Sequence, residues 1–123
     1  MHRLGGIVCL ISSSTEASEL ADQLRLANVQ VLFTCEALYG TSCEALKKIA
    51  TLPERVVLID SVASPGIRVP STVQYLNKLI EHDSAMSFPP SPELSPGLGA
   101  RLPAFICFSS GTSGKQVDLS STI

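Results

Sequence analysis

Hydroxyl and glycine residues crowd one short stretch near the end of the chain, and a lysine closes it. The stretch consists of Ser109, Ser110, Gly111, Thr112, Ser113, Gly114 and Lys115. Glycines permit backbone angles that other residues resist, so successive backbone N–H groups can turn toward one point and bind an anion. The hydroxyl donors and the lysine ammonium group would add to the attraction for a phosphate chain. This stretch is therefore the best candidate binding site in the sequence.

The stretch does not fit the general P-loop motif. That motif requires glycine at the position of Ser109 and a serine or threonine at the position of Gln116. On composition alone, a run of serine, threonine and glycine is also an ordinary loop, and this interpretation stays open. The apolar run Ala104–Phe108, which leads directly into the stretch, favours a binding site.

Strand and helix patterns alternate in the first half of the chain. The expected strands are 5–11, 29–34 and 55–60, and the expected helices are 15–28 and 36–50. The strands are predicted from short apolar or β-branched runs, and the helices from apolar residues at helical spacing. Ser13 and Glu16 are predicted to form a capping box at the start of the first helix. The alternation predicts an α/β fold with a parallel sheet and flanking helices, in which the first helix and the strands around it form a β-α-β unit.

The regular pattern weakens after the third strand. Apolar spacing over 73–80 predicts a short helix, and the proline- and glycine-rich run that follows cannot sustain a helix or a strand ladder. Residues 104–108 and 116–119 have strand patterns. The predicted organisation is an α/β subdomain at 1–81, an exposed linker at 82–102, and a terminal segment at 103–123 with a strand, the candidate loop and the start of another strand.

Composition excludes several classes of partner. Hydrophobic residues make up 45% of the 123 residues and charged residues 16%, with a net charge of −2. This balance is typical of a globular protein, and a chain of this length fits one domain at most. Without a basic excess or any tryptophan, the chain is not expected to bind nucleic acid. The apolar run Leu4–Ile11 is shorter than the roughly 20 residues of a membrane span.

The cysteines indicate a reducing compartment rather than a metal site. Cys9, Cys35, Cys43 and Cys107 show no C-x-x-C spacing, and no histidine lies near a cysteine pair. Zinc is therefore not expected. Three of the four cysteines lie in or beside apolar runs, where a free thiol packs like a small hydrophobic group, so we expect reduced cysteines and a cytoplasmic protein.

The candidate stretch also resembles a known signature. Ser110–Gly114, preceded by the aromatic Phe108, is similar to the phosphate loop of the adenylate-forming superfamily, which includes acyl-CoA synthetases and coumarate-CoA ligases. The resemblance extends upstream to the Gly5–Val8 strand, to Glu19–Leu20 with Gln23–Leu24, and to the next two strands. It departs from the family after Gly114, where Pro-Lys-Gly normally follows one variable residue. Either Lys115 occupies the variable position, or residues are missing between it and Val117.

The resemblance implies a function that one loop cannot perform alone. It implies a ligase that activates a carboxylic acid with ATP and Mg²⁺ to an acyl-adenylate, for transfer to CoA, with ATP bound by residues 109–115. The family's catalytic motifs lie downstream of this loop, and catalysis by positioning needs all of them together. We therefore expect an inactive fragment of the family's N-terminal domain, from which no catalytic residue or protein-bound metal is assigned. Some relatives are peroxisomal, but Ser121–Ile123 is not a peroxisomal signal.

Two alternatives of other classes stay open. One is a truncated, non-catalytic α/β module that binds phosphate or a partner weakly and self-associates through exposed sheet edges. The other is an unrelated nucleotide-binding or response-regulator protein, for which Asp60 is the best acidic residue at a strand end. The competing interpretation of Asp60 is a helix or turn cap.

Overall fold

The structure, a computed structural model, describes part of the chain. The described residues are 5–50, 53, 55–60, 69–70, 73–83, 90, 93, 95–97, 101–108 and 117–118. The chain divides into two compact units, one formed by Ser13–Met86 and the other by Met1–Ser12 with Ser87–Ile123. The boundaries expected from the sequence, 1–81, 82–102 and 103–123, stay a prediction.

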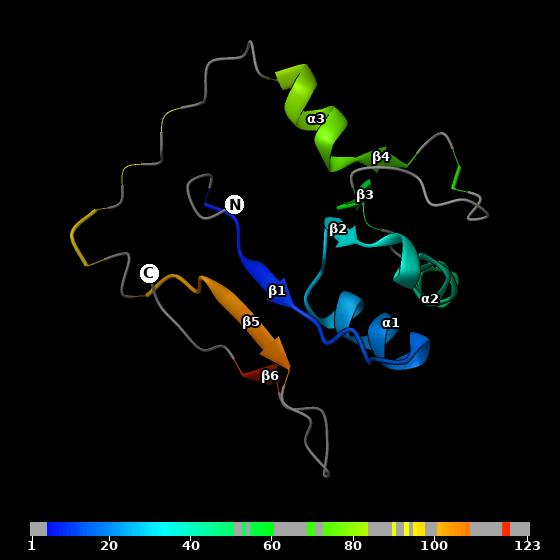
Figure 1. Cartoon of the computed structure of the whole chain (residues 1–123). Helices are drawn as coiled ribbons and strands as arrows, with labels where there is room; N and C mark the ends of the chain where they lie inside the picture. Colours follow the sequence, from blue (N-terminus) through cyan, green and yellow to red (C-terminus); the bar gives the residue numbers. More distant parts are fainter. Residues whose placement is uncertain are drawn as a thin grey trace. The chain divides into compact units, whose positions relative to one another are not determined.

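A parallel sheet of three strands forms the centre of the Ser13–Met86 unit (Figure 1). Its strands, in spatial order, are β2 (Val31–Thr34), β3 (Arg55–Leu58) and β4 (Gln74–Tyr75). The pairing of β2 with β3 runs from Val31↔Arg55 to Thr34↔Leu58. In the middle strand β3, the last two side chains are buried in the core: Val57 is 2% exposed and Leu58 is 0% exposed. The strands predicted at 29–34 and 55–60 are confirmed, with shorter bounds.

Three helices lie in the described part of this unit, and the first two bury small or branched apolar residues. They are α1 (Ala17–Leu26), α2 (Glu36–Leu46) and α3 (Leu76–Asp83). The first two pack against each other (Figure 1). In α1, Leu20, Ala21 and Leu24 recur at helical spacing and are buried, and in α2 Ala45 is 0% exposed.

The start of α1 differs from the prediction, and the predicted capping box of Ser13 and Glu16 is not formed. The helix begins at Ala17, so Glu16 itself occupies the N-cap position with an extended backbone, and no side chain of the N-cap residue caps the helix. Ser13 therefore lies too far before the helix to act as its cap.

The other end of α1 has a well-defined stop. Asn28 has a φ of 48°, in the left-handed region that asparagine tolerates better than most residues. Its N–H donates to the Arg25 carbonyl at 3.2 Å, and the Val29 N–H donates to the Leu24 carbonyl at 3.1 Å. These two bonds form a Schellman motif, which ends the helix and leads the chain into β2.

The second unit contains a separate sheet. It has β5 (Phe105–Phe108) in the middle, between β1 (Val8–Leu10) and β6 (Val117–Asp118). The β1 strand runs parallel to β5, whereas β6 is antiparallel to it. Ala104, just before β5, is 4% exposed, and its carbonyl accepts a hydrogen bond from the Val8 N–H at 2.9 Å.

The α/β class is confirmed, but the strand partners differ from the expectation. The β-α-β unit expected around α1 is wrong, because β1 pairs with β5 and β2 pairs with β3, in different sheets. The sequence pattern also missed β4, whose two residues lie at the start of the predicted helix 73–80. Between 84 and 102, the residues that the structure describes are exposed and belong to no helix or strand. Of the helices in the described part, none is long and apolar enough to span a bilayer.

Candidate functional site

The candidate stretch Ser109–Lys115 lies outside the described residues, but the strands on both sides of it are described. Phe108, the last residue of β5, is paired with Val117, the first residue of β6, and Cys107 is paired with Asp118. Paired residues in an antiparallel ladder lie about 4.5–5.5 Å apart between their Cα atoms. The chain therefore leaves the sheet at Phe108 and returns to the same place at Val117.

This point of departure lies at the carboxyl edge of two parallel strands. The β1–β5 register pairs Val8 with Phe105 and Leu10 with Cys107, so both strands end side by side. Open α/β sheets bind their ligands outside the carboxyl ends of such strands. The sequence predicted a strand running directly into the candidate stretch, and β5 confirms that strand.

Cys9, in β1, is a poor candidate for thiol chemistry. The four cysteines, all within the described residues, are free thiols. Burial raises the pKa of Cys9, and the neighbouring Cys107 raises it further. A thiol held in its neutral form is a poor nucleophile and a poor metal ligand. No group of three or more histidine, cysteine, aspartate or glutamate residues within the described ranges could hold a metal ion.

A second polar cluster lies at the carboxyl edge of the other sheet, where β2, β3 and β4 end. Asp60, two residues after β3, accepts a hydrogen bond from the Glu36 backbone N–H at its Oδ2 atom, over 2.6 Å. Glu36 is the first residue of α2, so Asp60, which follows β3, caps the start of that helix. The interpretation of Asp60 as a helix cap is confirmed, and this carboxylate is committed to a structural bond.

The same cluster contains contacts that the sequence did not indicate. The Tyr75 hydroxyl donates to Glu36 Oε1 at 2.8 Å, although Glu36 is only 4% exposed. This hydrogen bond is the largest cause of a raised pKa at Tyr75, followed by burial and by the charges of Glu36 and Asp60. The protonated phenol is therefore the favoured form. Nearby, the hydroxyls of Thr34 and Ser42 are 3.2 Å apart and bond to each other.

A signal for part of this cluster was present in the sequence. Thr34 and Asp60 each follow a β-branched run, and neighbouring parallel strands end at one edge. Tyr75 had no such signal, because it is 39 residues from Glu36 and β4 was read as helix.

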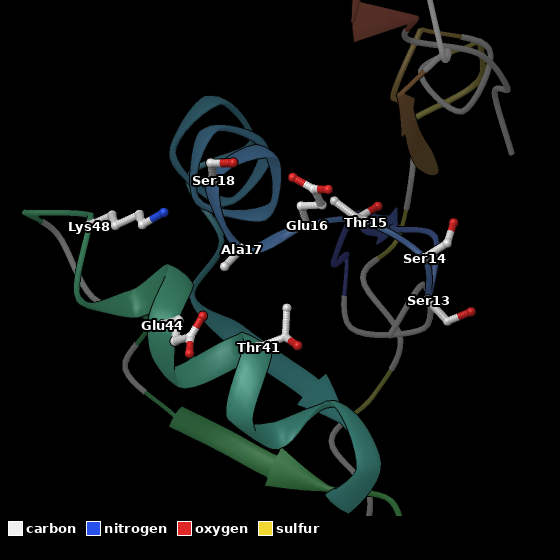
Figure 2. A pocket seen from close by; sticks show the side chains of 9 residues that line it. All are labelled: Ser13, Ser14, Thr15, Glu16, Ala17, Ser18, Thr41, Glu44 and Lys48. Atoms are coloured by element: carbon white, nitrogen blue, oxygen red, sulfur yellow. The ribbon is translucent and has the colours of Figure 1, made fainter.

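An open cleft of about 520 Å³ lies between the start of α1 and one side of α2 (Figure 2). Figure 2 shows the side chains of Thr41 and Glu44 on α2 and those of Ala17 and Ser18 on α1. Its remaining lining residues are Ser13, Ser14, Thr15, Glu16 and Lys48. The hydroxyls and one lysine favour an anion, but the two carboxylates oppose it. This arrangement assigns no ligand to the cleft.

Comparison with known proteins gives one consistent result. The acyl-CoA ligase AKT1 of Alternaria alternata is 40% identical over 119 residues, which cover 94% of this chain and 20% of that protein. The acyl-CoA ligase AFT1-1 of the same species has the same identity and coverage. The acyl-CoA ligase gloD of Glarea lozoyensis is 31% identical over 120 residues, covering 93% of this chain and 20% of that protein. No protein-family model matches the chain.

The fold is that of an α/β protein. The strand that precedes the candidate stretch ends at the carboxyl edge of a parallel strand pair. Within that class, the curated relatives that match nearly the whole chain are acyl-CoA ligases, in agreement with the resemblance predicted from its sequence. The chain spans about a fifth of the length of the curated relatives it matches.

Proposed function

We propose that this chain supplies the ATP-phosphate loop of an acyl-CoA ligase, with residues 109–115 as the binding residues. The observation that supports the proposal is the Phe108↔Val117 pair, because it brings together the two ends of the glycine- and hydroxyl-rich stretch at the carboxyl edge of β1 and β5. Closing the two ends lowers the conformational entropy that the loop would lose when it binds an anion. The acyl-CoA ligase relatives support the choice of ATP as that anion.

In the proposed reaction, ATP converts a carboxylic acid to an acyl-adenylate with release of pyrophosphate, and CoA then takes the acyl group with release of AMP. The loop's backbone N–H groups, its hydroxyls and Lys115 would hold the phosphate oxygens and keep the phosphate chain oriented. Mg²⁺ would reduce the charge on those oxygens, and it usually binds through substrate phosphates with few carboxylates.

The isolated chain would not catalyse this reaction, because one phosphate loop cannot position an acid, ATP and CoA together. We further propose that residues 82–102 act as a linker, that the protein works in the cytoplasm, and that the isolated chain self-associates through its sheet edges. The competing function is a non-catalytic α/β module with weak phosphate or partner binding, which is compatible with a match to one fifth of each relative.

Amide chemical shifts of the chain, titrated with MgATP and separately with inorganic pyrophosphate, test the binding site. We expect the shift changes to concentrate in 109–116 and in the flanking strands β1, β5 and β6. A Lys115→Gln variant should weaken binding of both ligands. The matched control is Lys47→Gln, which removes an exposed lysine of the other unit that does not line the α1–α2 cleft, and it should leave binding unchanged.

Changes confined to the Ser13–Met86 unit, or no change with either ligand, would contradict the proposal. A chimera separates binding from catalysis: this chain replaces the matching fifth of AKT1, and exchange of pyrophosphate into ATP is measured with the acid that AKT1 itself accepts. Exchange that depends on Ser110 and Lys115 in the chimera, but is absent from the isolated chain, would support the ligase. Phosphate binding without exchange in a folded chimera would favour the non-catalytic module.

A further inference from the structure

Glu36 connects three elements of the Ser13–Met86 unit. It is the first residue of α2, and its backbone N–H donates to Asp60, which follows β3. Its side chain accepts the hydroxyl proton of Tyr75, the last residue of β4, over 2.8 Å. Hydrogen bonds to a carboxylate are stronger than those between neutral groups, and a nearly buried acceptor loses little of that strength to water. The Tyr75–Glu36 bond is therefore a strong link between β4 and α2.

Apart from this bond, the strand–helix segment β4–α3 is attached to the sheet by a short described ladder. It pairs with β3 through Val57↔Gln74 and Leu58↔Tyr75, whereas β2 pairs with β3 over twice that length. On α3, the apolar side chain of Ile80 is 63% exposed, so this helix buries only part of its apolar surface. Segments with short ladders and exposed apolar residues open at lower free energy than the core of a unit.

Helix α3 is also connected to the same tyrosine. The Nζ atom of Lys78 lies 5.9 Å from the centre of the Tyr75 ring, within the range of a cation–π contact. Tyr75 thus has α3 on its ring and α2 on its hydroxyl. Within the described part of the chain, the charged groups that act on this tyrosine are Glu36 from α2, Asp60 after β3 and Lys78 from α3.

We propose that the Tyr75–Glu36 hydrogen bond is a latch that holds β4 and α3 on the sheet, and that its release lets this segment open as one piece. The rest of the unit, built on α1, β2, α2 and β3, stays folded during that opening. The latch lies in the unit that does not contain residues 109–115, so it does not rest on the proposed nucleotide binding.

Amide hydrogen exchange of the full chain, resolved by peptide, tests the latch. Tyr75→Phe removes only the hydroxyl, so exchange in residues 74–83 should accelerate about tenfold, the usual effect of losing a hydrogen bond to a charged group. Exchange in residues 17–46 should stay unchanged, which also shows that the variant folds. The matched control is Tyr39→Phe, which removes the phenol hydroxyl of α2 and should leave exchange in 74–83 unchanged.

A second variant tests the acceptor. Glu36→Gln keeps an oxygen that can accept the bond but removes its charge, so it should accelerate exchange in 74–83 less than Tyr75→Phe does. Unchanged exchange of 74–83 in Tyr75→Phe would overturn the latch. Equal acceleration in 74–83 and 17–46 would also overturn it, because β4 and α3 would then open only with the whole unit.

Discussion

Replacing Gly40 by alanine should stabilise the Ser13–Met86 unit. Gly40 lies inside α2, and it is not one of the described glycines with a positive φ, which are Gly5 and Gly97. A Cβ atom added at Gly40 would meet no atom within 4 Å. Alanine therefore fits without a clash, and it loses less backbone entropy on folding than glycine does. The expected gain in the free energy of unfolding is about 0.5–1 kcal/mol.

Urea unfolding followed by far-ultraviolet circular dichroism measures this gain. The chain contains no tryptophan, so intrinsic indole fluorescence is absent, and the described helices all lie in this unit. With a urea dependence of about 1–1.5 kcal/mol per molar, the unfolding midpoint should rise by about 0.3–1 M. The slope of the transition should stay the same, because the surface exposed on unfolding changes little.

A reverse substitution in the same helix provides the control. Ala37 is exposed in the first turn of α2, so Ala37→Gly should lower the midpoint, by less than Gly40→Ala raises it, because first-turn residues are less constrained. A Gly40→Ala midpoint at or below that of the unchanged chain would refute the reasoning. It would mean that α2 is not regular at this position or that another part of the molecule covers it.

Three further predictions concern the core and the polar cluster. Leu58→Ala should lower the free energy of unfolding by about 3 kcal/mol in the same urea assay, because Leu58 is fully buried in the middle strand. Asp60→Ala should lower the free energy of unfolding by about 1–2 kcal/mol, and with it the melting temperature, because the Glu36 N–H loses its acceptor. Asp60→Asn should lower the free energy of unfolding less, because its side-chain oxygen can still accept. The hydrogen bond to Glu36 raises the pKa of Tyr75. The stabilisation from this bond is therefore fully present below the ordinary tyrosine pKa of about 10, and it is lost as the pH rises through the raised pKa. In a Tyr39→Phe background, Glu36→Gln should shift the phenolate absorbance of Tyr75 to lower pH, and an unshifted titration would contradict the bond.

The sequence predicted those elements whose pattern is local. The strands at 29–34 and 55–60 and the helices over 15–28 and 36–50 were found because their apolar spacing is complete within one segment. Their ends were less accurate, since α1 begins after Glu16 and α2 ends at Leu46. These boundaries depend on backbone bonds such as the Schellman motif, which propensity does not encode.

Features that join distant residues were not predictable in the same way. The pairing of β1 with β5 joins Val8 to Phe105, and no local pattern selects that partner over β2. The strand β4 was missed because two residues of ladder carry no period of their own. At the polar cluster, Asp60 was identified as a cap from its residue type and position, but its partner Glu36 could not be named without the fold.

The two sheets differ in what their carboxyl edges have left to offer a ligand. At the edge of β2, β3 and β4, the polar side chains already have partners within the protein. The Thr34 hydroxyl bonds to that of Ser42, Asp60 accepts from the Glu36 backbone N–H, and the Tyr75 hydroxyl donates to the Glu36 carboxylate. A ligand binding there would have to break these bonds and replace them, which costs free energy. The edge of β1 and β5 leads instead into the glycine- and hydroxyl-rich stretch that β5 and β6 close. Since α/β proteins bind ligands at such edges, this second edge is the one that we propose for the phosphates of ATP. MgATP should accordingly shift the amides of β5 and β6 and leave those of Glu36 and Tyr75 in place.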